Sequence, residues 1–372
     1  MTKHDDYIAL FDRSIGVLFT DAVRITLRNP SMAAFFLHMR RAQKNARQRR
    51  TQLAGQGVHV LPFMIVSVTG QCNLSCAGCY AQAQDRQEER EMTDKELLDL
   101  VQQARDLGVG IILLAGGEPL TRSGELLAIA RAVPDVIFPV FTNGTLLDGS
   151  LVTRLRTQRN LIPVLSLEGG VEETDTRRGA GTMAHVQTVM SSLREAGIFF
   201  GTSLTVTRQN VETVTDEGYL RRLRERGCRL FFFVEYVPVR EGTEFLVLTQ
   251  EQRACLLSTV DILHDRLSGL FITLPGNEED YGGCLAAGRG FVHVSPGGRL
   301  EACPFAPYSD TSVRESSLRE ALGSPLLAAI REAHGRLTET RGGCALWAQR
   351  EWVRSLPGAE PTVGSPTEEQ RS

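Results

Sequence analysis

The sequence lacks any apolar run of the roughly 18 residues that a transmembrane helix needs. It also lacks, at its start, the positive charge, apolar core and small-residue cleavage site of a secretory signal. We therefore expect neither membrane insertion nor export. The net charge of −3 shows no excess of positive charge, which argues against nucleic acid as a partner of the whole chain.

The chain of 372 residues, 42% of them hydrophobic, is long enough to bury one large core with an appendage, or to form two domains. Its eight cysteines are unevenly clustered along the sequence. This distribution suits a reducing compartment, and we expect a cytoplasmic protein.

Three cysteines, Cys72, Cys76 and Cys79, form a C-x3-C-x2-C run directly before Tyr80. A structural zinc site needs four ligands, but no second cysteine pair lies nearby, and the nearest histidine, His59, precedes the apolar stretch that leads into the run. Zinc is therefore the weaker interpretation. Three thiolates on one loop can instead hold three irons of a [4Fe–4S] cube and leave the fourth iron open.

The cysteine run, together with Gly116-Gly117-Glu118-Pro119, resembles the radical S-adenosylmethionine (radical SAM) superfamily. The resemblance implies that SAM chelates the open iron and that a reduced cluster cleaves SAM to a 5′-deoxyadenosyl radical. This radical would abstract hydrogen from a peptide or small-molecule substrate, with flavodoxin or ferredoxin as reductant. Tyr80 would lie near the adenine, and the residues from Gly116 to Pro119 would contact the SAM amine.

Seven apolar, β-rich runs alternate with helical patterns, which predicts a parallel α/β sheet covered by helices. A capping box at Thr93 and Glu96 begins one of these helices. The pattern allows a partial barrel or a doubly wound sheet, and the resemblance selects a partial (β/α)6 barrel of the radical SAM type. The cysteine run, the Gly116 turn and Thr142-Asn143-Gly144 follow successive strands, so we expect them to meet at one rim. The expected strands are 63–69, 110–115, 136–141, 161–167, 198–206, 229–237 and 270–274.

The fourth strand ends in a turn that resembles the Ser-x-Asp-Gly turn of the same superfamily, with Ser166 and Glu168 as candidate SAM contacts. Glu168 replaces the more common aspartate. Arg178, with Arg177 as the alternative, matches an arginine that binds the SAM carboxylate through two hydrogen bonds. A solvated surface arginine is the competing interpretation.

Two further polar residues follow the fifth and sixth strands. Asn210 lies where relatives carry an asparagine, although a helix N-cap is the favoured interpretation. Glu235 shares a strand face with Phe231 and Phe233, and this face is expected to point into the barrel. Glu235 is thus a candidate catalytic carboxylate, with a solvated strand end as the alternative.

Cys284, Cys303 and Cys344 resemble the ligands of the auxiliary iron–sulfur extensions known as SPASM and twitch domains, with a hairpin predicted at Pro296-Gly297-Gly298. Trp347 occupies the position where the family pattern has a further cysteine. The extension therefore either binds a second cluster with an open iron or no longer binds one.

An open auxiliary iron could bind substrate or take His293 or Glu351 as a ligand. The other two cysteines, Cys228 and Cys255, are expected to be buried apolar thiols.

These features divide the chain into an N-terminal helical arm (1–60), a barrel (61–275), an auxiliary domain (276–352) and a disordered tail (353–372). The arm is expected to form helices broken at Asn29-Pro30 that pack over the barrel, with a basic run from Arg40 to Arg50 in solvent. Contact of this arm with a membrane surface or a peptide leader is the alternative. An electron-transfer or scaffold protein that does not cleave SAM is the competing function.

Overall fold

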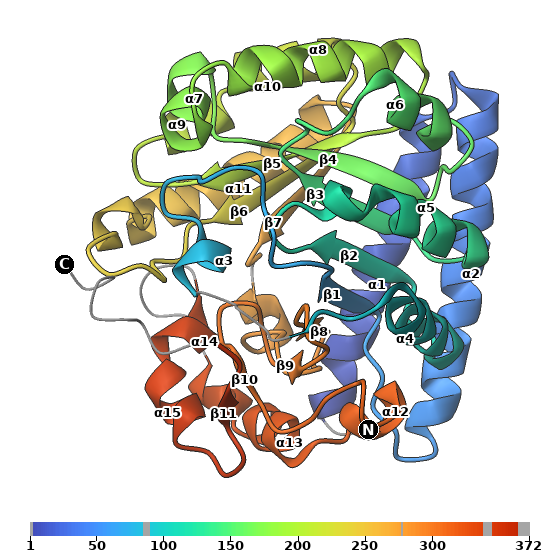
Figure 1. Cartoon of the computed structure of the whole chain (residues 1–372), viewed down its shortest axis with the longest axis vertical. Helices are drawn as coiled ribbons and strands as arrows, with labels where there is room; N and C mark the ends of the chain where they lie inside the picture. The colour runs from blue at the N-terminus through green and yellow to red at the C-terminus, as the bar shows by residue number, and fades with distance from the viewer. Residues whose placement is uncertain (1–2, 85–89, 277, 338–343, 364–372) are drawn as a thin grey trace.

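The computed structural model describes residues 3–84, 90–276, 278–337 and 344–363, and its centre is a curled parallel sheet (Figure 1). In the described residues the sheet has the order β7-β6-β5-β4-β3-β2-β1-β8-β9, so neighbours in sequence are neighbours in space through the first seven strands. All seven predicted strands are present. They are β1 (Phe63–Ser67), β2 (Ile111–Ala115), β3 (Phe138–Thr142), β4 (Leu161–Leu167), β5 (Gly201–Val206), β6 (Leu230–Glu235) and β7 (Leu270–Leu274).

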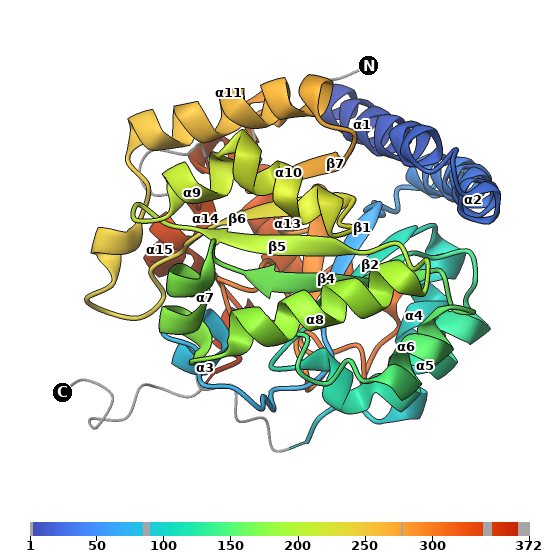
Figure 2. The ribbon, with the colours of Figure 1, turned by 90° about the horizontal axis from the view of Figure 1, so that it is seen from above.

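Helices cover the outer face of this curved sheet, which makes the fold a partial barrel (Figure 2). The expected capping box is present at the start of α4, where Thr93 caps the helix and Glu96 bonds back to the Thr93 backbone. The covering helices are α4 (Asp94–Leu107), α5 (Ser123–Ala132), α6 (Gly149–Leu155), α8 (Thr182–Glu195), α10 (Glu217–Glu225) and α11 (Gln250–Arg266). Three shorter helices, α3 (Tyr80–Ala83), α7 (Val171–Arg178) and α9 (Val211–Thr215), follow strand ends.

In several strands, among them β4 and β6, alternate residues enter two separate apolar cores, as the period of a strand requires. In β6, Phe231 and Phe233 pack with the outer helices. Phe232 and Val234 face the concave side, where they share a core with β4 residues such as Val164. Residues that alternate in step with Phe232 therefore face the concave side of the barrel, and residues in step with Phe231 face the outer helices.

The N-terminal arm forms two long helices, α1 (Lys3–Ile25) and α2 (Pro30–Ala54), with Asn29 as the N-cap at the predicted break. They lie beside each other along one side of the sheet (Figure 1). Phe36 of α2 contacts Phe199, and Gln43 donates a hydrogen bond to the Gly110 carbonyl, so the helices cover the amino ends of the strands. The expected packing over the barrel is confirmed.

Within the basic run, Arg50 departs from the expected solvated face. Its side chain is buried, where it pairs with Asp12 and donates to the Gly108 carbonyl. Arg40, Arg41 and Lys44 are exposed as expected. The basic run is therefore solvated at Arg40, Arg41 and Lys44 but not at Arg50.

The C-terminal extension continues the barrel sheet. Strand β8 (Phe291–Val294) pairs parallel with β1, and β9 (Leu300–Glu301) returns antiparallel, which confirms the predicted hairpin. The sequence boundary at residue 276 is therefore not a boundary of the sheet.

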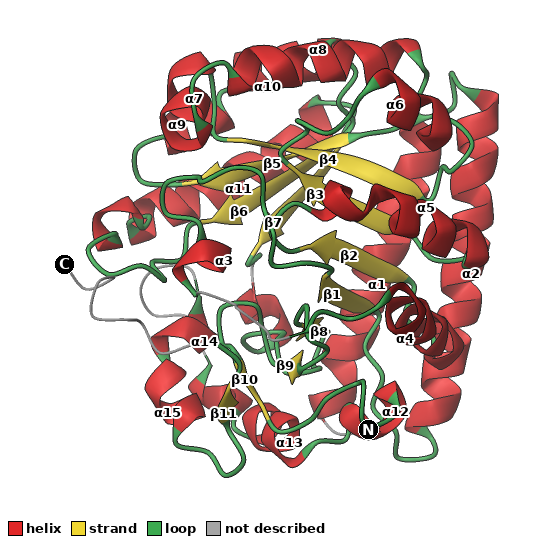
Figure 3. Ribbon diagram, viewed as in Figure 1, coloured by secondary structure: helices red, strands yellow, loops and turns green. Residues whose placement is uncertain are grey.

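Short elements complete the extension (Figure 3). Residues 318–332 form two helices, α12 and α13, because Pro325 begins a new helix. The tail was expected to be disordered from 353, but β11 pairs with β10 within it; residues 364–372 lie outside the described residues. The elements are α12 (Leu318–Ala321), α13 (Pro325–Glu332), α14 (Ala345–Ala348), α15 (Arg350–Arg354), β10 (Tyr308–Ser309) and β11 (Glu360–Pro361).

No helix among the described residues combines the length and the apolar character that crossing a membrane would require.

Candidate active site

The cysteine loop connects β1 to α3 at the carboxyl end of the sheet. Cys72 is exposed, and Cys76 and Cys79 are half-buried. Burial raises the pKa of the Cys72 and Cys76 thiols, while the nearby Arg178 guanidinium acts in the opposite direction on Cys76. Iron would favour the thiolate form strongly, so the loop offers three accessible sulfur ligands to a cluster.

The glycines after β2 pack directly against the chain that enters the cysteine loop. The Gly117 amide donates to the Thr69 carbonyl (2.8 Å), and the Glu118 amide donates to the Gln71 carbonyl (2.8 Å). A side chain at Gly116 would overlap Thr69, and Gly116 has a φ of 132° that favours glycine. The sequence suggested that these glycines allow close approach to a ligand; the structure shows that they allow close approach between two loops.

Gly117→Ala is expected to destabilise this junction, because the new Cβ would overlap the Gln71 carbonyl. We expect a loss of about 1–3 kcal/mol in the free energy of unfolding, typical of an overpacked site. Gly124→Ala is the matched control, since a Cβ there meets no atom within 4 Å and alanine suits the helix. Urea unfolding of both variants measures the difference, and equal midpoints for the two would contradict this reading of the glycines.

The Glu118 carboxylate is buried and binds the end of the third strand. It accepts hydrogen bonds from Thr142 Oγ1 (2.7 Å), the Asn143 amide (2.8 Å) and the Leu120 amide (3.0 Å). Burial raises the pKa of Glu118, against the lowering effect of these hydrogen bonds. Asn143 Nδ2 in turn donates to Asn73 Oδ1 (2.9 Å). The three loops predicted to converge on one rim do so, and the side chain of Glu118 connects two of them.

Glu168 and the two arginines of α7 form a buried ionic cluster behind the cysteine loop. Arg178 binds Glu168 through Nε to Oε2 (2.7 Å) and Nη2 to Oε1 (2.7 Å), and Arg177 Nη1 adds a third contact to Oε1 (2.6 Å). Burial by itself would lower the pKa of Arg178, but the Glu168 carboxylate outweighs it and the pKa is raised. Glu168 and Arg178, two of the residues predicted to contact SAM, therefore bind each other in this structure.

The same cluster holds the cysteine loop in place. Arg178 Nη1 lies 3.9 Å from Cys76 Sγ, and the Ala77 amide donates to the Arg177 carbonyl (2.9 Å). The Arg177 side chain also donates to the Ala77 carbonyl (3.0 Å). The fixed positive charge beside Cys76 favours its thiolate form.

Asn210 occupies the N-cap position of α9, but its side chain does not cap the helix. Instead Nδ2 donates to the carbonyls of Glu168 (2.6 Å) and Thr205 (2.8 Å), while Oδ1 accepts from the Thr207 amide (2.7 Å). The N-cap interpretation was thus right about the position of Asn210 and wrong about its side-chain hydrogen bond. Asn210 joins the ends of β4 and β5.

Glu235 does not point into the barrel. It shares the outer face with Phe231 and Phe233, and Arg253 of α11 binds both of its carboxylate oxygens (Nε distances of 3.0 and 3.2 Å). The expected catalytic role is not supported, because Glu235 faces the outer helices and not the concave side of the barrel. The sequence analysis did not consider the next residue, Tyr236, which lies in step with Phe232 and therefore on the concave side.

Ser166 and Tyr80 both lie at the carboxyl end of the barrel, near the end of β4 and directly after the cysteine run. Ser166 alternates in step with Ile162 and Val164, which belong to the core on the concave face, and its side chain is half-buried. Tyr80 begins α3 and packs edge-on against Phe305, with 5.0 Å between ring centroids. The C-terminal extension therefore contacts the cysteine loop directly.

The three cysteines of the extension come together in its interior. Cys284, Cys303 and Cys344 are all buried, and Cys303 interacts with both of the other two. Burial raises the pKa of Cys284 and Cys303 well above the ordinary thiol value, and Glu278, which bonds to Cys284, adds to this effect on Cys284. The donor set fits a buried iron–sulfur cluster.

His293 and Glu351, the two residues considered as a fourth ligand, are both engaged or directed elsewhere. His293 Nδ1 lies 2.6 Å from Glu301 Oε2, and His293 Nε2 lies 2.8 Å from Ser67 Oγ. The Glu351 side chain is 76% exposed. Within the described ranges, no three His, Cys, Asp or Glu side chains are arranged to hold a single metal ion.

The remaining two cysteines differ from each other. Cys228 is buried as expected, and burial raises its pKa to about 12. Cys255 is exposed on α11, so the expectation of a buried thiol was wrong there.

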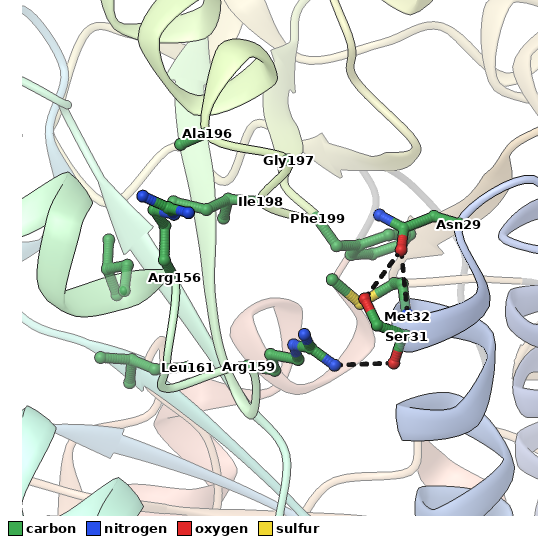
Figure 4. Close-up of a pocket in the computed structure, with 11 residues that line it drawn as sticks. Asn29, Ser31, Met32, Arg156, Arg159, Leu161, Ala196, Gly197, Ile198 and Phe199 are labelled. Atoms are coloured by element: carbon green, nitrogen blue, oxygen red, sulfur yellow. Dashed lines mark hydrogen bonds between the residues drawn. The ribbon is translucent and has the colours of Figure 1, made fainter.

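A cavity of about 220 Å³ lies away from this rim, between the α1–α2 turn and the amino ends of β4 and β5 (Figure 4). Asn29, Arg156 and Phe199 line it, and Arg159 donates to the Ser31 carbonyl (2.7 Å). It is not part of the candidate active site.

A partial barrel with a three-cysteine loop at the carboxyl ends of its strands defines an enzyme of the iron–sulfur, SAM-dependent class. The model of the Radical SAM superfamily matches residues 66–217. The AdoMet-dependent heme synthase of Nitratidesulfovibrio vulgaris is 31% identical over 280 residues, which cover 68% of this chain and 76% of the relative. The chain therefore belongs to the radical SAM superfamily.

Two further similarities agree with this assignment. The AdoMet-dependent heme synthase of Methanosarcina barkeri is 29% identical over 281 residues, covering 68% of this chain and 79% of the relative. The crystal structure of Streptococcus suis SuiB bound to S-adenosylmethionine has a TM-score of 0.62 at 20% identity, covering 77% of this chain and 72% of that chain. The second similarity shows the fold alone.

Proposed function

We propose that this enzyme binds a [4Fe–4S] cluster and SAM at the cysteine loop and cleaves SAM reductively. The observation that carries the proposal is the junction of three loops at one rim. The chain that enters the cysteine run is bonded to the Gly117 turn, and Asn73 within the run accepts a hydrogen bond from Asn143 of the third loop. An electron carrier has no need of the second and third of these loops. This is why the electron-transfer alternative is the weaker one.

The bound groups would supply a 5′-deoxyadenosyl radical that abstracts hydrogen from a substrate. Cys72, Cys76 and Cys79 would hold the cluster. Tyr80, the Gly116–Pro119 turn and Ser166 line the same rim and would bind SAM. Arg178 is held by Glu168, so its contribution is to fix the loop and place positive charge beside Cys76.

The test is anaerobic reconstitution with iron and sulfide, reduction with dithionite in the presence of SAM, and chromatography of 5′-deoxyadenosine. Production of 5′-deoxyadenosine supports the proposal. A protein with a full cluster that perturbs neither SAM nor the cluster spectrum on mixing would instead favour the electron-transfer alternative.

The substrate is either a peptide or a small molecule, and we favour a small molecule of the iron porphyrin class. AdoMet-dependent heme synthases are among the relatives with broad coverage. In addition, the N-terminal arm, which a leader peptide would have used, packs its apolar faces against the amino ends of the strands. An iron porphyrin that increases 5′-deoxyadenosine formation and is itself modified, as seen by mass spectrometry, would support this class. No modification of iron porphyrins would favour a peptide.

The three buried cysteines of the extension support a second, auxiliary cluster. Their side chains converge from three separate segments, although Trp347 stands where a further cysteine was expected. The contact between Phe305 and Tyr80, the residue proposed to lie near the SAM adenine, supports this arrangement. The auxiliary cluster would pass electrons or hold substrate, and a flavodoxin or ferredoxin would supply the first electron.

Cys284→Ala is expected to lower the iron content from about eight to about four atoms per chain, because one cluster loses a ligand. Iron and sulfide analysis after anaerobic reconstitution measures this change. Cys255→Ala is the control, since that thiol is exposed on α11 and far from both sets in the sequence. If the Cys284→Ala protein is folded by circular dichroism and keeps the wild-type iron content, the auxiliary cluster is ruled out.

A further inference from the structure

Tyr236, the residue immediately after β6, is buried at the carboxyl end of the barrel. It is 4% exposed, and its amide donates to the Val206 carbonyl (2.9 Å), which extends the β5–β6 pairing. Its parity is that of Phe232 and Val234, both of which belong to the concave-face core. The side chain therefore lies on the concave side of the sheet, where a ligand of the barrel would bind.

The tyrosine ring reaches the cysteine loop. A Cβ built on Gly78 would lie 2.8 Å from Tyr236 Oη and 3.3 Å from ring atom Cε2. Gly78 has a φ of 66° and stands between Cys76 and Cys79. The hydroxyl thus occupies the space that a side chain would fill in the middle of the cysteine run.

This hydroxyl has no hydrogen-bond partner among the described residues, although it is fully shielded from solvent. A buried tyrosine normally gives its O–H a partner, because leaving the group unpaired costs stability. The other buried tyrosine near the rim, Tyr219, follows this rule and donates to the Gly169 carbonyl (2.7 Å). Tyr236 is therefore a buried donor with no acceptor among the described residues.

We propose that Tyr236 donates a hydrogen bond to a sulfur atom of the cluster held by the cysteine loop. The inference rests on the proposed function, since it needs that cluster. A hydrogen bond to cluster sulfur strengthens as the cluster gains an electron, because the reduced cluster carries more negative charge. Tyr236 would therefore raise the reduction potential and act as a positioning residue for the electron transfer that precedes SAM cleavage.

The test compares Tyr236→Phe with wild type by a potentiometric titration followed by electron paramagnetic resonance. The relevant signal is the one that changes when SAM is added, and the titration itself is done without SAM. We expect unchanged iron content and about a tenfold smaller equilibrium constant for reduction, which corresponds to about 59 mV for a one-electron couple. Tyr281→Phe is the control, because that hydroxyl pairs with Ser14 Oγ (3.1 Å) on an exposed surface.

Three outcomes would overturn the inference. An unchanged midpoint potential at full iron content excludes a hydrogen bond to the cluster. An unchanged midpoint with weakened SAM binding assigns the acceptor to SAM instead. A wild-type protein that shows no reduced-cluster signal responding to SAM refutes the proposed function itself, and this failure is recognised before any variant is compared.

Discussion

Cys76→Ala is expected to abolish 5′-deoxyadenosine production. Cys76 is the central ligand of the run and lies beside Arg178, 3.9 Å from its Nη1. Two thiolates on this loop cannot replace three, so the cluster would lose its anchored geometry and with it the open iron. Chromatography of 5′-deoxyadenosine after anaerobic reduction with dithionite and SAM measures the effect, and we expect a fall to background.

The matched control is Cys255→Ala, which removes an exposed thiol of α11 and should keep wild-type production. Iron analysis of both variants separates loss of the cluster from loss of the fold. Production at the wild-type level in Cys76→Ala would refute the assignment of this loop as the cluster site.

Glu168→Ala is expected to destabilise the protein by about 3–5 kcal/mol, the cost of leaving buried charge without its partner. Glu168 is 2% exposed and accepts from both Arg177 and Arg178, whose side chains are 18% and 11% exposed. The alanine would leave two guanidinium groups unpaired behind the cysteine loop. Urea unfolding measures the loss as a lower midpoint.

The control for this substitution is Glu172→Ala on the exposed side of α7, which should change the free energy of unfolding by no more than about 0.5 kcal/mol. Glu168→Gln should fall between the two, since the amide keeps the shape and one acceptor oxygen. If Glu168→Ala unfolds at the same urea concentration as Glu172→Ala, the ionic cluster does not support the loop.

Local patterns in the sequence were enough to predict most elements of the fold. The seven strands, the capping box at Thr93, the helix break at Asn29 and the hairpin near Gly298 are all present. Each depends on residues close together in the chain, such as a cap, a proline or an apolar run. The convergence of the three loops also followed, because the carboxyl ends of parallel strands share one edge.

Contacts between distant segments could not be predicted in the same way. Glu235 and Tyr236 are neighbours at the end of a strand that is apolar on both faces, so the sequence could not tell which face is concave. Only the inclusion of Phe231 and Phe233 in the core of the outer helices decides it. The continuation of the barrel sheet by β8 and the pairing of β11 within the expected disordered tail have the same origin.

By itself, the sequence determined the chemistry that this protein can perform: three cysteines on one short loop, and a glycine turn one strand later. Tertiary structure decided how those groups are held, through the glycine contacts between loops, the pairing of Glu168 with Arg178, and the burial of Tyr236 against Gly78. The physical reason is the distance along the chain between the interacting residues. Ligand spacing and turn chemistry depend on a few consecutive residues, whereas burial, ion pairing and the facing of a strand depend on which distant segment packs against it.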